Sequence, residues 1–249
     1  MKSIFFYQSI LLFLTSIRFT CSVATSVPTT SALASATTKI SEPTLNFGND
    51  NTHKTNFIAE CALPSTFGNF RMRSYVYMSS KQSLEPVVVV SGDVRGKEDI
   101  LVRVHDQCLT SEVFGSLRCD CREQLHQSLR MISKNSGIVI YLQQEGRGIG
   151  LANKIAAYSL QDSGMDTVDA NNHLGFKDEL REYLAVADIL KDLDIRSILL
   201  MTNNPYKIDQ IQALGIKIKE RIPIQIPPGL YNRAYLKSKV YTTSSLQFV

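Results

Sequence analysis

The chain lacks a strong charge of either sign. Its 249 residues carry 27 Lys and Arg against 23 Asp and Glu, and beyond residue 56 the balance is 23 against 21. Nucleic-acid-binding domains usually carry a clear basic surplus on one face or along one element. The composition therefore gives no reason to expect a nucleic-acid partner. With 44% hydrophobic residues, the chain is nevertheless apolar enough to bury a core.

A hydrophobic run long enough to span a membrane is also missing. The N-terminus MKSIFFYQSILLFLTSIRFTCSVATS places Lys2 before an apolar stretch from Ile4 to Ile17, followed by small residues up to Ala24. About 14 residues are fewer than the roughly 20 that a spanning helix needs, and the pattern is typical of a secretory signal peptide. We therefore expect a signal segment over residues 1–24 and no stable membrane span. A transmembrane anchor and a disordered tail are the alternatives.

Residues 25–56 are poor in acidic and apolar side chains. Ser, Thr, Ala and Asn dominate, and only Glu42 and Asp50 are acidic, so little apolar area is available to offset the entropy of ordering. We interpret this stretch as a disordered linker or a second targeting segment. With the signal segment, it predicts entry into the secretory route, ending in secretion or in an organelle such as a plastid.

Cysteines are few and odd in number. Of the five, Cys21 lies in the signal segment and Cys61 stands alone, which we interpret as a small buried apolar residue. The other three, Cys108, Cys119 and Cys121, lie together in CLTSEVFGSLRCDC. A disulfide between residues two apart would be strained, and an odd count disfavours a disulfide framework. A metal site is therefore the stronger interpretation.

No fourth cysteine completes this cluster. Three thiolates around Zn²⁺ leave one position open for water, which is the arrangement of a catalytic rather than a structural zinc site. Zinc lowers the pKa of such a water toward about 7, which supplies hydroxide at neutral pH. The alternative is a structural zinc site closed by His105 or His126.

Internal repeats are absent, and the apolar spacing changes between strand-like and helix-like along the chain. FIAECALPSTFGNFRMRSYVYM, from Phe57, has the alternation of short antiparallel strands, and β-branched runs follow within residues 85–109. Later segments alternate strand and helix. We predict an α/β fold (mixed α+β) in which a front antiparallel layer joins a mixed or parallel sheet covered by helices, with a catalytic domain over 57–240 and a polar tail over 241–249. The expected helices span 122–136, 151–164, 182–193 and 206–214, and the expected later strands span 137–144, 197–202 and 216–220.

Helix ends and faces are predicted from glycines and apolar spacing. Gly137 follows the first expected helix at a position typical of a left-handed cap. The inner side of the second helix, LANKIAAYSLQDSG, is expected to be formed by Leu151, Ile155, Ala156, Ser159 and Leu160.

Two turns carry residues that suit an anionic ligand. QQEGRGIG contains glycines that let backbone N–H groups approach a phosphate, with Arg147 nearby and a helix start after it. It lacks the Gly-Lys-Ser/Thr ending of a nucleoside triphosphatase loop, and an ordinary tight turn is the alternative. MTNNPYK ends a strand and opens a helix, so Thr202 and Lys207 could meet a ligand at the carboxyl edge of the sheet. A simple helix cap by Asn203 or Asn204 is the alternative there.

Four long motifs occur together and in order: LVRVHDQCLTSEVFGSLRCDC, YLQQEGRGIGLANKIAAYSLQDSGMDTVDAN, LGFKDELREY and LMTNNPYK. From about Phe57 to Lys239 the chain resembles GTP cyclohydrolase II, the family that opens the guanine ring at the start of riboflavin synthesis. The resemblance implies a homodimeric zinc hydrolase that converts GTP to formate, pyrophosphate and 2,5-diamino-6-ribosylamino-4(3H)-pyrimidinone 5′-phosphate. A dihydroxybutanone-phosphate synthase, often fused ahead of this enzyme, has no room in the first 56 residues, so a monofunctional enzyme is expected.

The resemblance also implies which residues bind the metals and the substrate. One Zn²⁺ per subunit is expected on Cys108, Cys119 and Cys121, and Mg²⁺ is expected with the triphosphate. GTP is expected to contact Arg103, Val104, His105, Asp106, Gln107, Gln124, Glu145, Gly146, Arg147, Thr167, Thr202 and Lys207.

Three further residues match catalytic positions of the family. Tyr158 matches a tyrosine associated with catalysis, Arg181 an arginine described as a nucleophile toward the α-phosphate, and Glu179 a proton acceptor. That acceptor is aspartate in the family's pattern, so the carboxylate of Glu179 reaches one methylene further. Asp178 could substitute only through a local shift, because neighbours on a helix face about 100° apart. A misplacement of around 1 Å can cost on the order of a hundredfold in rate.

The roles of these residues stay open at this point. Arg181 either forms a covalent guanylyl adduct with help from Glu179 or only stabilises charge, because a guanidinium with a pKa above about 12 is a poor nucleophile. Tyr158, with an ordinary pKa near about 10, suits a proton donor. Apart from the resemblance, Glu179 and Arg181 would be an exposed helical ion pair of little energetic weight. The alternatives for the whole chain are a GTP-binding descendant that has lost turnover and a structural zinc module.

Overall fold

The computed structural model describes residues 53–79, 83–165, 174–175 and 179–227. All of them belong to one folded unit, Asn49–Val249. The predicted signal segment, residues 25–52 of the predicted linker, the predicted C-terminal tail, Cys21, Thr167 and Asp178 lie outside the described residues.

An antiparallel hairpin comes first. β1 (Lys54–Ser65) and β2 (Gly68–Met78) pair along their length, and β2 pairs in turn with β3 (Ser83–Leu84) and β4 (Val87–Ser91). Tyr75 in β2 is buried, whereas its neighbours in the strand are only partly covered, as the period-two pattern of a strand requires. The predicted antiparallel strands are confirmed.

The antiparallel and parallel parts form one continuous sheet. Its eight strands run in the order β1-β2-β4-β6-β5-β7-β8, with β3 beside β2. β6 pairs antiparallel with β4 and parallel with β5, so the strand direction changes there. The predicted mixed α/β fold is confirmed. The remaining strands are β5 (Ile100–Asp106), β6 (Gly137–Leu142), β7 (Ile198–Met201) and β8 (Ile218–Ile222).

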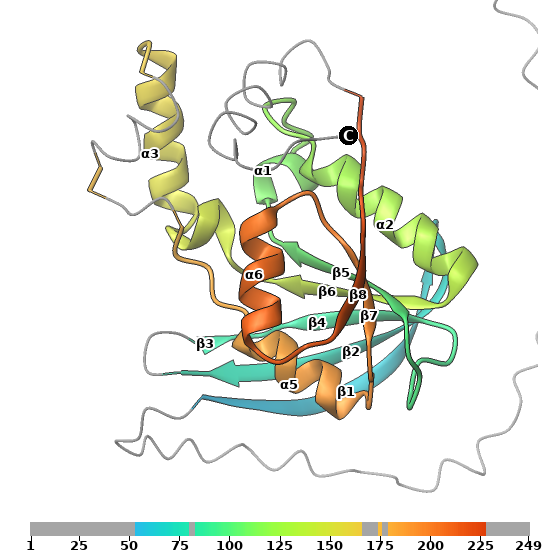
Figure 1. The fold of residues 1–249 in the computed structure, drawn as a ribbon. Coiled ribbons are helices and arrows are strands. Elements are labelled where there is room, and N and C mark those ends of the chain that lie inside the picture. Colours follow the sequence, from blue (N-terminus) through green and yellow to red (C-terminus); the bar gives the residue numbers. More distant parts are fainter. Residues whose placement is uncertain (1–52, 80–82, 166–173, 176–178, 228–249) are drawn as a thin grey trace, which may run out of the picture. The chain divides into compact units, whose positions relative to one another are not determined.

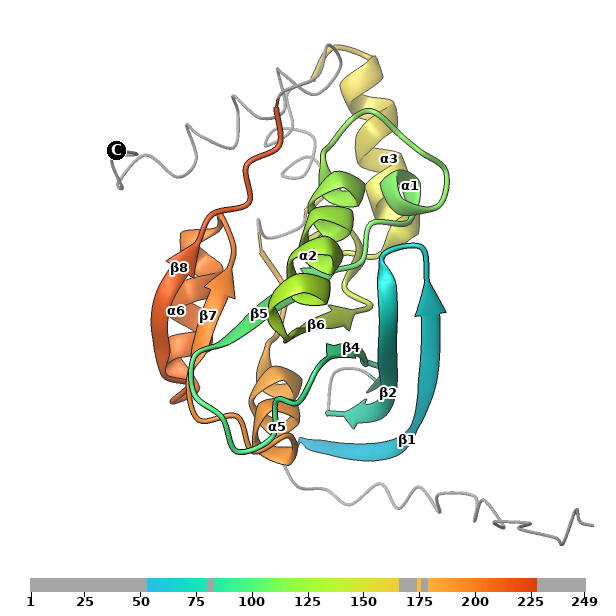
Figure 2. The same cartoon turned by 90° about the vertical axis from the view of Figure 1, so that its right-hand side faces the viewer.

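Helices cover both faces of this sheet. α2 packs on one face and α5 and α6 on the other, while α3 projects beyond the sheet at the upper left of Figure 1 (compare Figure 2). Among the described residues, no helix is both long and apolar enough to cross a membrane. The helices are α1 (Leu109–Glu112), α2 (Cys121–Asn135), the 3-10 turn η1 (Glu145–Gly148), α3 (Leu151–Asp162), α5 (Leu184–Asp192) and α6 (Pro205–Ala213).

The core follows from strand alternation. In β5, Val102 and Val104 face α5, whereas Leu101 faces α2 on the other side. Ile189 of α5 and Ile132 of α2 are both fully buried against these two faces. Because fully burying one such side chain contributes about 1.5–3 kcal/mol, the two apolar layers hold the sheet and its helices together.

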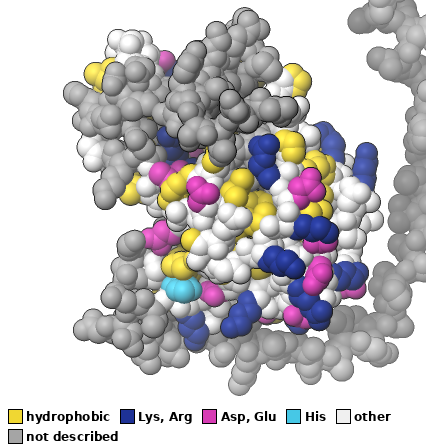
Figure 3. Space-filling view, in the orientation of Figure 1, with side chains coloured by type: hydrophobic (Ala, Val, Ile, Leu, Met, Phe, Trp, Pro, Cys, Tyr) yellow, Lys and Arg dark blue, Asp and Glu magenta, His cyan; other side chains and the backbone are white. Residues whose placement is uncertain are grey.

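Charged side chains of both signs are mixed on the surface. On the face seen in Figure 3, Lys and Arg lie among Asp and Glu rather than in a patch of one sign. Arg73 pairs with Glu60 at 2.9 Å and with Asp192 at 2.7 Å, which joins β1, β2 and the end of α5. The near balance of charge in the sequence thus corresponds to local pairing.

The prediction that Cys61 is buried is wrong. Its side chain is exposed on β1, opposite Met72 of β2. β1 is the edge strand of the sheet, and most of its residues are exposed. An edge strand can show the apolar alternation of a core strand without having a layer on both faces.

The predicted inner side of α3 is also wrong. Leu151 and Ile155 are 37% and 48% exposed, whereas Lys154 and Ala157 are buried. Ser159 is exposed as well. α3 does not lie on the sheet, so its apolar side chains Leu151 and Ile155 have no core to pack against.

The prediction of a left-handed cap at Gly137 is wrong. Ser136 ends α2 with φ 46, and Gly137 is the first residue of β6. A Cβ on Gly137 would lie 2.5 Å from the carbonyl oxygen of Leu101 and 2.9 Å from Cγ2 of Ile132. Glycine is required at 137 because β5 and α2 approach its Cα closely, not because of its backbone angles.

Gly137→Ala is expected to lower the free energy of unfolding by about 1–3 kcal/mol, since the added methyl group would force strand β5 and helix α2 apart. Denaturant titration measures this effect. Lys134→Ala, on the exposed end of α2, is the control and should leave the midpoint nearly unchanged. Equal midpoints for Gly137→Ala and the parent would contradict the close approach.

Candidate active site

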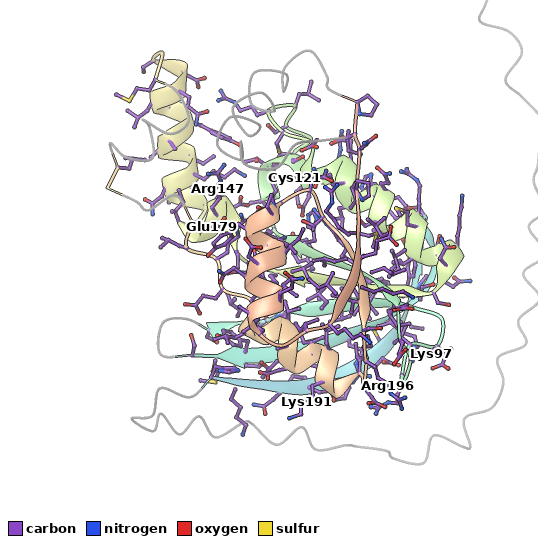
Figure 4. All side chains as sticks on the ribbon, viewed as in Figure 1. Lys97, Cys121, Arg147, Glu179, Lys191 and Arg196 are labelled. Carbon is purple, nitrogen blue, oxygen red and sulfur yellow. The ribbon has the colours of Figure 1, made fainter. Side chains whose placement is uncertain are left out.

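The candidate functional residues gather where parallel strands end. Cys108 follows β5, η1 follows β6 and α6 follows β7, and parallel pairing brings these ends to one edge of the sheet. Cys121, Arg147 and Glu179 lie at this edge in Figure 4, away from Lys191 at the other end. Crevices at the carboxyl ends of parallel strands are where α/β proteins bind ligands.

Three thiols lie together at this edge. The sulfur atoms of Cys108, Cys119 and Cys121 lie within 4.8 Å of one another, and those of Cys108 and Cys119 are 3.6 Å apart. A disulfide would require about 2.05 Å. Within the part of the chain that the structure describes, no His, Asp or Glu atom joins this group. The cluster can therefore hold a metal ion with a position left open.

The two histidines considered as a fourth ligand contact other residues. Nε2 of His105 lies 2.7 Å from Oε1 of Glu112, and the ring of His126 lies 4.8 Å from that of Phe67. Burial lowers the pKa of His105, although Glu112 opposes this shift. Neither histidine closes the thiol cluster, so the alternative of a structural zinc site is not formed in this arrangement.

A buried lysine lies against the thiol cluster. Nζ of Lys154 is 3.2 Å from Sγ of Cys108, 3.0 Å from Oγ1 of Thr110 and 2.6 Å from Oε1 of Glu145. Lys154 was not among the site residues predicted from the sequence. No local signal indicated it, because Lys154 lies on the side of α3 away from the predicted inner residues.

The glycine turn η1 is held in a left-handed conformation. Gly146 and Arg147 both have φ 62, which is uncommon for a residue with a side chain. The N–H of Leu180 donates to the carbonyl of Arg147 at 3.0 Å, and a Cβ on Gly148 would lie 3.0 Å from the backbone of Leu180. The turn is therefore packed directly against the segment that carries Glu179 and Arg181.

Asp106, the last residue of β5, joins two cations. Its Oδ2 accepts from Nη1 of Arg181 at 2.6 Å, from Nζ of Lys207 at 2.9 Å and from the hydroxyl of Tyr183 at 3.3 Å. Lys207 also donates to the carbonyl of Val104 at 2.7 Å, while the Val104 side chain is buried in the core. Burial alone would raise the pKa of Asp106, but Lys207 and Arg181 outweigh it and lower that pKa to about 2. Burial lowers the pKa of Lys207 to about 8, against the opposing effect of Asp106.

Glu179 and Arg181 form a partly buried pair outside any helix. Nε of Arg181 donates to Oε1 of Glu179 at 2.6 Å, and Nη2 donates to Oε2. The segment precedes α5 and is not helical, so the interpretation as an exposed helical pair is wrong. Burial would lower the pKa of Arg181, but Glu179 and Asp106 raise it above its ordinary value.

A buried chain of polar side chains runs beside the thiols. Arg103 donates to Oε1 of Gln124 at 2.8 Å, and Nε2 of Gln124 donates to Asp120 at 2.7 Å. Arg103 also donates to the carbonyl of Met201 at 3.0 Å and lies 3.4 Å from Nδ1 of His105. Among the described residues, Nε of Arg103, Oδ1 of Asp120 and Oδ1 of Asp106 are buried without a partner. Buried polar atoms of this kind are usually satisfied by a ligand or water.

The polar side chains of the turn after β7 bond to backbone groups of the turn itself and of the segment after β8. Oγ1 of Thr202 accepts from the N–H of Asn204 at 3.1 Å, and Oδ1 of Asn203 accepts from the N–H of Ile224 at 3.0 Å. Asn204 precedes α6 without a side-chain cap bond in the described structure. Just after the neighbouring strand β5, the N–H of Gln107 donates to the carbonyl of Leu142, the last residue of β6, at 2.8 Å. Lys207 is the side chain of this turn that reaches the Asp106 cluster.

Asp106→Asn is expected to lower the free energy of unfolding by about 3–5 kcal/mol at pH 7, because it leaves two buried cations without their shared carboxylate. Asp106 raises the pKa of Lys207, so without it that pKa falls below the parent value of about 8; the folded variant then holds fewer protons than the folded parent, and the deficit should shrink as pH rises from 7 to 9. Denaturant unfolding at both pH values measures this. Asp93→Asn, which breaks an exposed pair with Lys97, is the matched control and should have little effect. A deficit of the same size at both pH values would contradict the coupling to Lys207.

The chain is similar in sequence to known proteins of one family. A family model described as GTP cyclohydrolase II matches residues 56–223. A GTP cyclohydrolase-2 from Picrophilus torridus is 50% identical over 184 residues, covering 74% of this chain and 94% of that protein. Riboflavin biosynthesis protein RibBA from Chlorobium phaeovibrioides is 49% identical over 181 residues, covering 72% of this chain and 44% of that protein.

Other matches differ in coverage and in distance. RibBA from Bacillus cereus is 48% identical over 183 residues, covering 73% of this chain and 46% of that protein. The chain therefore spans less than half the length of these two RibBA proteins. A crystal structure of RibBX, a two-domain 3,4-dihydroxy-2-butanone 4-phosphate synthase from A. baumannii, has a TM-score of 0.36 and 16% identity over 72% of this chain and 42% of that chain, which is too distant to inform the fold. From the family match and the identity to its relatives, the chain belongs to the GTP cyclohydrolase II family.

Proposed function

We propose that the chain is a zinc-dependent GTP cyclohydrolase II. It would open the imidazole ring of guanine in GTP, release formate and pyrophosphate, and give 2,5-diamino-6-ribosylamino-4(3H)-pyrimidinone 5′-phosphate, the first step of riboflavin biosynthesis. The observation that carries this proposal is the group of three thiol sulfurs within 4.8 Å, at the same sheet edge as Arg181 and Lys207. The 50% identity to a GTP cyclohydrolase-2 over 94% of its length supports it.

The donor set suits zinc. A tetrahedral site with Zn–S distances of about 2.3 Å separates its sulfurs by about 3.8 Å, and the sulfurs of Cys108 and Cys119 are 3.6 Å apart. Bound there, zinc would supply a Lewis acid and a water of lowered pKa for attack on C8 of guanine. Cys108, Cys119 and Cys121 would hold it, leaving the fourth position for that water.

On the phosphate side, we infer that Arg181 and Lys207 stabilise negative charge, with Mg²⁺ entering on the triphosphate. The guanidinium of Arg181 donates to both Asp106 and Glu179, and these carboxylates raise its pKa further. A guanidinium held protonated in this way is a poor nucleophile. Of the two roles considered for Arg181, the geometry therefore favours the fixed cation, with Glu179 holding it in place.

We infer that Tyr158 donates a proton. Burial raises the pKa of Tyr158, so its hydroxyl stays protonated at neutral pH. The guanidinium of Arg118 lies 4.6 Å from the centre of its ring, and Nζ of Lys154 lies 5.6 Å from it. These cations fix the ring of Tyr158 in place by attraction to its face. The homodimer and the secretory route stay predictions, to be checked by light scattering and by the destination of a tagged chain.

The direct test incubates the purified full chain with GTP, Zn²⁺ and Mg²⁺ and quantifies formate and pyrophosphate. Both products are expected from the parent protein, and Cys119→Ser should lose formate because a sulfur ligand is gone. Tyr158→Phe should lower formate production by about a hundredfold, in the range of one general acid. Cys61→Ser, on the exposed face of β1, is the matched control and should release both products at the parent rate.

The same assay separates the competing functions. Pyrophosphate without formate from the parent protein would mean that only the phosphate chemistry is present. Neither product, from folded and zinc-loaded protein, would favour a GTP-binding descendant without turnover. Unchanged formate production in Tyr158→Phe would contradict the proton-donor role of Tyr158 and leave the rest of the proposed function standing.

The role of Arg181 is tested by trapping. GTP labelled at the α-phosphate is mixed with the enzyme and the reaction is quenched in denaturant, and no label is expected to stay on the protein. Glu179→Gln should slow pyrophosphate release by about a hundredfold, because the guanidinium loses its charged partner and its position. Glu179→Asp, which keeps the charge, should lose less. Covalent label that disappears in Arg181→Gln would show a nucleophilic arginine instead.

A further inference from the structure

Lys154 occupies a position that neither the sequence motifs nor the resemblance explains. It is the fourth residue of α3, 8% exposed, and its ammonium group meets a thiol, a hydroxyl and a carboxylate at once. Burying an ammonium is costly unless it is paired and hydrogen-bonded. A lysine kept here must therefore be balanced by negative charge on more than one side.

The charges around this ammonium match a metal-loaded site. A divalent ion on three thiolates leaves one net negative charge, which faces Lys154 through Cys108 at 3.2 Å. Glu145 supplies a second negative charge at 2.6 Å from the same nitrogen. Lys154 is thus held as a cation between the thiol cluster and the glycine turn.

We propose that Lys154 is a positioning residue of the metal centre, donating a hydrogen bond to the Cys108 thiolate and thereby setting its orientation and its electron donation to the ion. The inference rests on the proposed zinc centre. Groups that hydrogen-bond to metal ligands commonly set ligand orientation and metal properties. Because Nζ also pairs with Glu145, the same contact ties the metal ligands to the turn Glu145–Gly148.

A purely structural role would produce a different result. If Lys154 served only to neutralise Glu145, its removal would affect stability and leave the electronic state of Cys108 untouched. If it donates to the thiolate, the cation lowers the energy of the sulfur electrons, and more energy is needed to move an electron from sulfur to a bound metal. Charge-transfer absorption of a cobalt-substituted site reports this directly and needs no catalysis.

The experiment loads the full chain with Co²⁺ and records the sulfur-to-cobalt absorption of the parent, Lys154→Met and Lys154→Arg. The band of Lys154→Met is expected at longer wavelength, and its Zn²⁺ affinity in chelator competition should fall about tenfold or more. Lys154→Arg keeps a cation that can donate to sulfur, so its band should lie close to that of the parent. Lys191→Met, on the exposed surface of α5, is the matched control and should change neither quantity.

The outcomes separate this inference from the proposed function. A band that stays in place in Lys154→Met at full cobalt occupancy would overturn the role of Lys154 while leaving the zinc centre intact. Failure of the parent protein to bind Zn²⁺ or Co²⁺ would overturn both. If Lys154→Met does not fold, as judged by circular dichroism, Lys154→Leu serves instead, because it also lacks a donor and an unmoved band there overturns the proposal equally.

Discussion

The structure of the site depends on one buried carboxylate. Asp106 ends the central strand β5 and binds Arg181 and Lys207, which lie 75 and 101 residues further along the chain. Either cation alone would be costly to bury, and the carboxylate alone equally so. The segment before α5, the start of α6 and the end of β5 must therefore meet together, because the charges are tolerable only as a group.

The thiol cluster shows why part of the site could be predicted from the sequence. Cys108 lies two residues after the end of β5 and Cys121 opens α2, so local rules for strand ends and helix starts already place the sulfurs near each other. The same local rules predicted the sheet strands and helices α2, α5 and α6. Periodicity and turn residues act over a few positions, and where a contact spans only such a distance, the sequence pattern contains the information.

Other features of the structure could not be predicted from the sequence, because they depend on contacts between residues far apart in the chain. Leu151 and Ile155 have the spacing of a buried helix face, yet α3 lies off the sheet and Lys154 is the buried residue. Gly137 has the position of a helix cap, yet its small size is needed for the approach of Leu101 from another strand. The pairing of Asp106 with distant cations could not be predicted either. In each case the partner lies far away in the chain, and spacing alone does not identify it.

The glutamate at 179 can be understood from the same geometry. Two of its contacts come from one guanidinium, with Nε of Arg181 on one carboxylate oxygen and Nη2 on the other. The pair forms within a non-helical segment whose next residue, Leu180, is fixed against Arg147 of the glycine turn. Since the backbone is held there, the side chain has to span the distance to Arg181. Glu179 and Arg181 lie two positions apart in this same segment, so its local backbone sets how far the carboxylate must reach, and the extra methylene of glutamate, relative to the aspartate of the family's pattern, lengthens that reach.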